Sequence, residues 1–180
     1  MDPPDWLLGH SAAVADVAAF LAAAIELRGH AINVGLIEAA AVLHDVDKAV
    51  PPGHPLKQLR HGEAGAAFLR ERGHDQLASA VEGHPVTRLS DDEHYFAWSR
   101  GATVEERVVA YADKRARQDV VSMDERFRDW IERHGDSPEI RLARERAVVL
   151  EEEVCAAAGI SPEEVRRAPW AVAALEGAAG

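Results

Sequence analysis

A histidine and an aspartate stand side by side, His44 and Asp45, at the end of a stretch that is apolar on almost every side. The preceding residues, 36–43, contain one charged group, Glu38, so this segment suits the buried centre of a domain. Burying an imidazole and a carboxylate costs on the order of several kcal/mol unless they are paired or bind a metal ion. Adjacent helical residues diverge by about 100°, but where a helix ends both side chains can reach one ion. The pair therefore predicts a metal site.

The chemistry of this pair narrows the choice of ion. One imidazole nitrogen and one carboxylate oxygen favour a first-row transition metal, whereas calcium prefers a shell made of oxygen atoms alone. We therefore predict a divalent ion of iron, manganese, nickel, cobalt or zinc.

A second histidine, His10, continues an apolar stripe in the first helical stretch of the chain. The stripe is formed by Val14, Val17 and Leu21, which follow the helical period. Such a face turns toward the core, so we expect His10 to point inward. Taken alone, His10 is more simply interpreted as a core histidine that donates to a carbonyl oxygen.

An aspartate, Asp113, follows the apolar residues Val108, Val109 and Ala112 on a further predicted helix. This helix should pack inward, which would bring the carboxylate toward the core. The alternative is an ion pair with a basic neighbour on the same helix. The candidates for that pair are Lys114, Arg117 and Arg107.

The order His10, His44-Asp45 and Asp113 carries a family resemblance. The stretches LLGHSAAVADVAAFLAAA and EAAAVLHDVDKA resemble the opening of the HD-domain superfamily, helical metal-dependent phosphohydrolases named for this His-Asp pair. The later YADKRARQD resembles the segment that carries the family's last aspartate. The resemblance covers about residues 7 to 120. It implies that His10, His44, Asp45 and Asp113 bind the metal.

Lys48 lies four residues after His44 and should project beside the metal if helical geometry continues. A lysine at that position can hold a phosphate oxygen as a point charge. In the family pattern HD-x-G-K this lysine is often present, but here Asp47 replaces the common glycine. Asp47 could brace the turn or act on water, and we favour the bracing role because a metal ion itself lowers the pKa of bound water toward about 7.

Two further histidines, His61 and His84, decide between one ion and two. Both resemble positions where two-metal HD proteins, including those that split dinucleoside polyphosphates, supply extra histidines. They could bind a second ion or contact the substrate. The alternative is that His61 only starts a helix and His84 only lies in a turn, and that neither binds a second ion.

The resemblance implies a metal-dependent phosphohydrolase, in which metal-activated water attacks the phosphorus of a nucleotide or another small phosphorylated metabolite. Lys48 and Asp45 are the catalytic candidates. Arg60 and Arg115 are lesser candidates, with Lys48, for binding the substrate phosphate. Two other functions stay open: an HD-fold di-iron oxygenase, which needs a full second ligand set, and a non-catalytic module that binds metal and nucleotide.

The elements that position these residues are all predicted to be helical. The hydrophobic fraction is 47% but only 6% of residues are aromatic, so alanine, valine and leucine dominate, and alternating strand patterns are absent. Ser90 with Glu93, and Thr103 with Glu106, predict capping boxes, each at the start of a helix. The other predicted helices are 7–28, 35–45, 55–72, 75–82, 123–134, 138–158 and a short one after Ser161.

We predict a single all-α, orthogonally packed HD-type domain over residues 1–180. Its metal-binding core should cover about residues 7–120, followed by a helical extension over about 121–176. The Ala-rich end, AVAALEGAAG, could support a homodimer.

The charge and the termini bear on partners and compartment. A net charge of −11 argues against a nucleic-acid partner but permits a small phosphorylated substrate, since a bound cation reverses the local field. The one cysteine, Cys155, fits a reducing compartment. We expect neither a signal peptide nor an apolar stretch of the roughly 20 residues that a bilayer span needs. These features predict a cytoplasmic protein without membrane contact.

Overall fold

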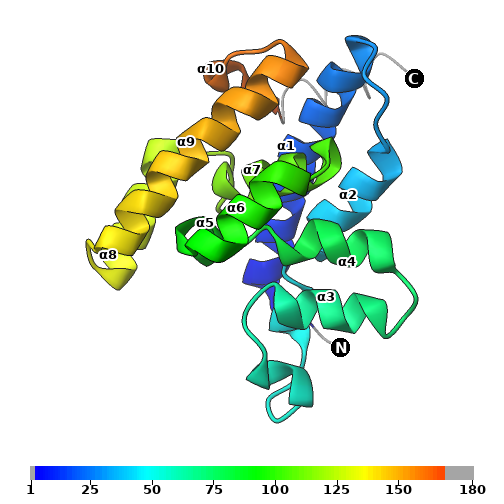
Figure 1. Cartoon of the computed structure of the whole chain (residues 1–180), viewed down its shortest axis with the longest axis vertical. Coiled ribbons are helices and arrows are strands. Elements are labelled where there is room, and N and C mark those ends of the chain that lie inside the picture. Colours follow the sequence, from blue (N-terminus) through cyan, green and yellow to red (C-terminus); the bar gives the residue numbers. More distant parts are fainter. Residues whose placement is uncertain (1–2, 169–180) are drawn as a thin grey trace.

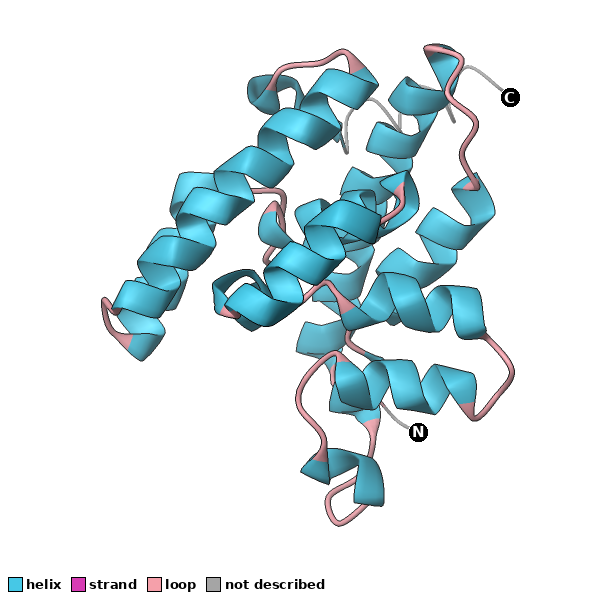
Figure 2. Cartoon of the chain, in the orientation of Figure 1, coloured by secondary structure: helices cyan, strands magenta, loops and turns pink. Residues whose placement is uncertain are grey.

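The computed structural model describes residues 3–168. Over this range the chain forms ten α-helices and two short 3₁₀ helices, and no strand beyond one isolated bridge between Ala116 and Val120 (Figure 2). The predicted all-α class is confirmed.

The core is built around α1 (Asp5–Leu27), which contacts α2 (Val34–Leu43), α7 (Val104–Lys114) and α9 (Pro138–Ala158). Figure 1 shows α9, in yellow and orange, running along one side of the molecule, while α2 lies on the other side. Most of the side chains that fill this core are aliphatic groups at helical spacing, as in α1, where Val14, Val17, Leu21 and Ile25 are fully buried.

A second, smaller layer is formed by α3 (Glu63–Arg70) and α4 (Asp75–Glu82), which lie side by side (Figure 1). Their own apolar cluster includes Leu56, Phe68 and Val81. Because α4 also contacts α2 and α7, this layer brings the segment after α2 close to the start of α3 and the end of α4.

Local signals set most helix ends. Thr103 and Ser122 form capping boxes at the starts of α7 and of α8 (Met123–His134), and Ser161 forms one before α10 (Pro162–Val165). The predicted box at Ser90 is wrong: Ser90 ends α5 (Val86–Ser90), and the Asp91 carboxylate caps α6 (Asp92–Gly101) instead.

The predicted helix over 55–72 is also wrong in part. The chain forms a 3₁₀ helix over Pro55–Gln58 and then an irregular turn before α3 begins at Glu63. Gly62 explains the interruption, because its φ of +87° is incompatible with a continuous right-handed helix. The interruption also leaves His61 in the turn, outside the helix.

Contrary to the prediction, α1 has the length and hydropathy of a membrane span: its 23 residues include an 18-residue window with a mean hydropathy of 1.7. That window is 50% buried against the rest of the chain. Core helices of soluble proteins have the same length and composition, and α1 contacts three other core helices.

The helices after residue 120 share the core of the preceding ones. The main apolar cluster joins Val17 and Tyr111 to Phe127 of α8, Leu150 of α9 and Val165 of α10. The remainder of the predicted extension, residues 169–176, and the Ala-rich segment AVAALEGAAG lie outside the described residues.

Candidate metal centre

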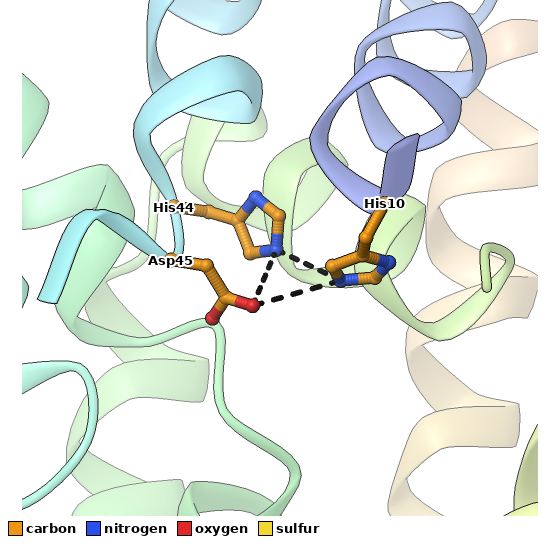
Figure 3. Close-up of side chains that lie close together, drawn as sticks. All are labelled: His10, His44 and Asp45. Atoms are coloured by element: carbon orange, nitrogen blue, oxygen red, sulfur yellow. Dashed lines mark hydrogen bonds and ion pairs between the residues drawn. The ribbon is translucent and has the colours of Figure 1, made fainter. Parts of the chain in front are cut away.

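Three separate elements bring the four predicted ligands together. His10 lies on α1, His44 immediately follows α2, Asp45 is the next residue, and Asp113 lies near the end of α7. All four side chains are buried. Figure 3 shows His10 reaching across from its helix toward His44 and Asp45.

The ligand atoms lie within about one coordination shell. Nε2 of His10 is 3.1 Å from Nε2 of His44, 3.8 Å from Oδ2 of Asp45 and 3.2 Å from Oδ1 of Asp113. Nε2 of His44 is 3.6 Å from the Asp45 oxygen and 3.8 Å from the Asp113 oxygen. Two imidazoles and two carboxylates thus converge on one point.

The other ring nitrogens show which atoms are free to bind a cation. Nδ1 of His10 donates to the Arg117 carbonyl oxygen at 2.7 Å, and Nδ1 of His44 donates to the Ala41 carbonyl oxygen at 2.7 Å. A carbonyl can only accept, so each neutral ring presents the lone pair of Nε2 to the cluster. Lone pairs and carboxylates facing one another repel unless a cation lies among them, and this arrangement therefore fits a divalent metal.

A second group of ligands shares Asp45. Nε2 of His61 is 3.1 Å from Oδ1 of Asp45, Nε2 of His84 is 3.5 Å from the same oxygen, and the two nitrogens are 3.1 Å apart. Nδ1 of His84 donates to the Val81 carbonyl oxygen at 2.5 Å, so its Nε2 also faces the cluster as an acceptor. His61 and His84 therefore belong to the site geometrically.

Asp47 braces this second group. Its Oδ2 lies 3.0 Å from Nδ1 of His61, a carboxylate–histidine contact of the kind that orients metal ligands. Nζ of Lys57 donates to the Asp47 backbone carbonyl oxygen at 2.8 Å. The favoured bracing role of Asp47 is thus the one that these contacts support.

The electrostatics of the cluster favour a bound cation. Burial lowers the pKa of His44 to about 4 and also lowers that of His84, which keeps both rings neutral. Burial alone would raise the pKa of Asp45, but the contacts with His61 and His84 hold it well below its usual range. Although burial opposes it, Asp45 and Asp47 raise the pKa of His61 to about 9, so these two carboxylates draw positive charge to that position.

Several buried side-chain atoms of the described residues lack a hydrogen-bond partner, and two of them, Oδ1 of Asp45 and Oδ1 of Asp47, lie in this site. Oδ1 of Asp45 lies between Nε2 of His61 and Nε2 of His84, and it has no hydrogen bond when these nitrogens are unprotonated, as metal ligands must be. An unsatisfied carboxylate oxygen at such a depth is costly, and a metal ion would satisfy it. The residues present thus fit a bound metal on both sides of Asp45.

Two lysines border the ligands. Nζ of Lys48, on the 3₁₀ helix Val46–Ala49, lies 2.7 Å from Oδ2 of Asp45 and is partly exposed. Lys114 is fully buried: its Nζ lies 3.1 Å from Oδ2 of Asp113 and donates to the His84 carbonyl oxygen. Lys48 can therefore meet a substrate, whereas Lys114 ties α7 to the turn after α4.

The two arginine candidates lie elsewhere. Arg115 does not reach the ligand cluster: its buried guanidinium donates to the Val121 and Pro162 carbonyl oxygens, to the Tyr111 hydroxyl and to Glu151. Because these partners occupy its donors, the predicted phosphate contact of Arg115 is replaced by a structural role. Arg60 is exposed and lines a hollow of about 400 Å³ together with His61.

The ligand cluster opens on a larger cavity of about 430 Å³. His10, Asp45 and Lys48 line it, and so do Arg126 and Trp130 of α8. The cavity thus offers metal ligands, a cation and an aromatic ring to the same small molecule.

Arg126 and Trp130 were not among the site residues predicted from the sequence. Their spacing of four, continued by Arg133, places basic and aromatic groups on one face of α8, and that pattern was visible in the sequence. Nothing in the sequence alone showed that this face would turn toward His10.

Comparisons with known proteins agree with this geometry. A protein from Methanocaldococcus jannaschii, described only as uncharacterized, is 34% identical over 113 residues, covering 58% of this chain and 62% of that protein. The chain therefore spans less than two thirds of this relative's length. No solved structure matches. Residues 7–118 match the HD domain, a range that contains all six histidine and aspartate candidates for metal binding. This chain belongs to the HD domain family.

Proposed function

We propose that the protein is a metal-dependent phosphohydrolase that acts on a nucleotide or another small phosphorylated metabolite. One observation carries the proposal: buried imidazole and carboxylate ligands converge at the end of a cavity that Lys48 also lines. The chain has a net charge of −11, which repels anions overall. The cationic side chains of the cavity attract an anionic substrate locally.

Each residue has a separate task in this proposal. His10, His44, Asp45 and Asp113 hold the ion, and the carbonyl oxygens bonded to both histidines keep their Nε2 atoms free for it. A bound divalent ion of this type supplies an activated water molecule near neutral pH. Lys48 is proposed to neutralise a phosphate oxygen, since its Nζ reaches both Asp45 and the cavity. Arg60 is a more distant phosphate candidate.

We further propose two ions per chain, with Asp45 as their shared ligand. Support comes from the two oxygens of Asp45, one facing His10 and His44, the other facing His61 and His84. A pair of ions can stabilise both the attacking and the leaving oxygen of a displacement at phosphorus. The same pairing favours a second candidate function, a di-iron oxygenase of this fold, because a shared carboxylate between two histidine groups can also hold two iron ions.

The test combines metal analysis with an activity panel. Elemental analysis should find about two ions per chain after loading with manganese or iron. Phosphate release from nucleotides and phosphoesters should then depend on the metal. No release with manganese, iron, cobalt or nickel, although metal is bound, would reject the hydrolase in favour of a binding module, and oxygen uptake by an iron-loaded protein would favour the oxygenase.

Three variants and one control test the ligand set. Asp45→Asn should reduce metal content in both groups, and His44→Ala should mainly reduce the first. His61→Ala should lower the content by about one ion, because His10, His44 and Asp113 are unchanged. His30→Ala is the matched control, since His30 is exposed and outside the site. Full metal content in Asp45→Asn would contradict the assignment.

A further inference from the structure

Helix α8 turns a basic and aromatic face toward the metal-ligand cavity. Arg126, Trp130 and Arg133 all line the cavity and follow one another at intervals of four and three residues. This helix lies outside residues 7–118, the range matched by the HD domain. The part of the cavity wall that α8 forms is therefore a feature of the chain beyond the matched range.

Arg126 is the residue of this wall that lies nearest the ligands. Its side chain is 10% exposed, and one guanidinium nitrogen, Nη2, is 3.6 Å from Oδ1 of Asp113. The guanidinium carbon lies 4.4 Å from the centre of the Trp130 ring, and Nε is buried without a hydrogen-bond partner. A guanidinium held by stacking and only partly paired is suited to accept an anion.

Two more arginines extend the positive charge along the cavity. Arg117 and Arg133 line it, and both pair with Asp129, at 3.5 Å and 3.2 Å. Arg117 also lies 3.6 Å from Asp119. The side chains of Arg117 and Arg133 are 41% and 56% exposed, so both guanidinium groups can still contact a ligand in the cavity. Together with Lys48 and Arg126, these two arginines place four cationic side chains around one cavity, enough to contact more than one phosphate group.

The size of the cavity also indicates a substrate larger than a single phosphate group. A volume of about 430 Å³ lies within the range of sites for whole small molecules, from about 300 to about 1,000 Å³. A single phosphate held by the metal ligands and Lys48 would leave most of this space empty. The rest of a larger substrate can lie along α8, because Arg126, Trp130 and Arg133 line the same cavity.

We propose that Arg126 and Arg133, with Arg117 beside them, form a second anion site for the substrate. The preferred substrates then carry at least two phosphate groups, one at the metal ligands and one bound by the forked guanidinium groups of α8. This inference rests on the proposed function, and it names the substrate class as diphosphates and longer phosphate chains. Arg126 and Arg133 would then act as specificity residues.

Binding measurements can test this site without turnover. We would titrate the manganese-loaded full chain, in a buffer with excess Mn²⁺, with AMP and with the non-hydrolysable α,β-methylene analogue of ADP. The two ligands differ mainly in the second phosphate. The wild type should bind the diphosphate analogue at least about tenfold more tightly, corresponding to one charge-assisted contact.

Substitutions locate the effect on α8. Arg126→Met and Arg133→Met should each remove most of the preference for the diphosphate analogue while AMP binding changes less than about twofold. Arg133→Met is included because Arg133 is exposed and its loss should not disturb folding. Arg128→Met is the matched control: it removes the same charge from an exposed position on α8 that does not line the cavity.

The possible outcomes separate the two proposals. Equal weakening of both ligands by Arg133→Met, or the same loss of preference in Arg128→Met, would overturn the second anion site. If the wild type prefers the diphosphate analogue through Arg133 but releases no phosphate from any compound, the anion site stands and the hydrolase proposal fails. Hydrolysis without any preference for a second phosphate would support the hydrolase and reject the second anion site.

Discussion

Arg115 and Arg126 are both buried, but their guanidinium groups have different surroundings and different roles. The guanidinium of Arg115 has several partners, including the Tyr111 hydroxyl and Glu151, and it joins α7 to α9. Arg126 has a stacking partner and one carboxylate at 3.6 Å, and its Nε has no partner. An arginine whose donors all have partners within the protein stabilises the fold. An arginine beside a cavity that has donors without partners can bind a ligand.

At this scale, Arg115→Met should destabilise the protein by about 3–5 kcal/mol, because it leaves the partly buried Glu151 carboxylate without its cation. Chemical unfolding measures the loss. The double variant Arg115→Met with Glu151→Met should be less destabilised than the single one, since no uncompensated charge is left. If the single variant unfolds like the wild type, or if it selectively loses phosphate affinity, the structural role of Arg115 is wrong.

At the scale of elements, the second ligand group depends on the close approach of two turns. His61 precedes Gly62 at the start of α3, and His84 follows α4. A Cβ atom on Gly62 would lie 2.7 Å from the Glu82 carbonyl oxygen and 2.8 Å from Cγ of Pro85. A glycine at this position is therefore what allows the turn carrying His61 to approach the turn carrying His84.

Gly62→Ala should accordingly push these turns apart and reduce metal binding at the second group. Gly53→Ala is the matched control, because Gly53 has a similar φ of +84° but nothing within 4 Å of its Cβ position. Both variants carry the strain of an alanine at positive φ, and Gly62→Ala should cost about 1–3 kcal/mol more through overpacking. Denaturant unfolding and metal content would check this, and equal losses in the two variants would contradict it.

At the scale of the whole molecule, the helices before and after residue 120 share one core. Phe127, Ala147, Leu150 and Val154 belong to the same apolar cluster as the buried face of α1. Removing α8, α9 and α10 would expose that face to water. The cavity would lose its wall of arginines at the same time.

We therefore expect the full chain to unfold in one cooperative transition, and a fragment of residues 1–120 to lack a stable fold. Circular dichroism with thermal and chemical unfolding would measure both. A soluble fragment 1–120 that keeps its helix content and melts cooperatively would instead make the metal-binding core a domain in its own right.

Much of the fold could be predicted because its signals are local. The bounds of α4, α8 and α9 follow the apolar periodicity, and Ser122 and Ser137 at helix starts accept hydrogen bonds from amides three residues on. The mistakes also have local causes. Ser90 and Asp91 offer competing caps one residue apart, and the turn at Gly62 breaks a pattern that otherwise continues as a helix.

The pair His44-Asp45, the all-α class and the order of the candidate ligands could be found in the sequence, because adjacency and helical period are properties of the chain. The folded arrangement was needed to show that His61 and His84 meet at Asp45, that Arg115 faces the core, and that Arg126 faces the cavity. The reason is physical: periodicity tells which residues share a face of a helix, but only the packing of distant helices determines what that face contacts.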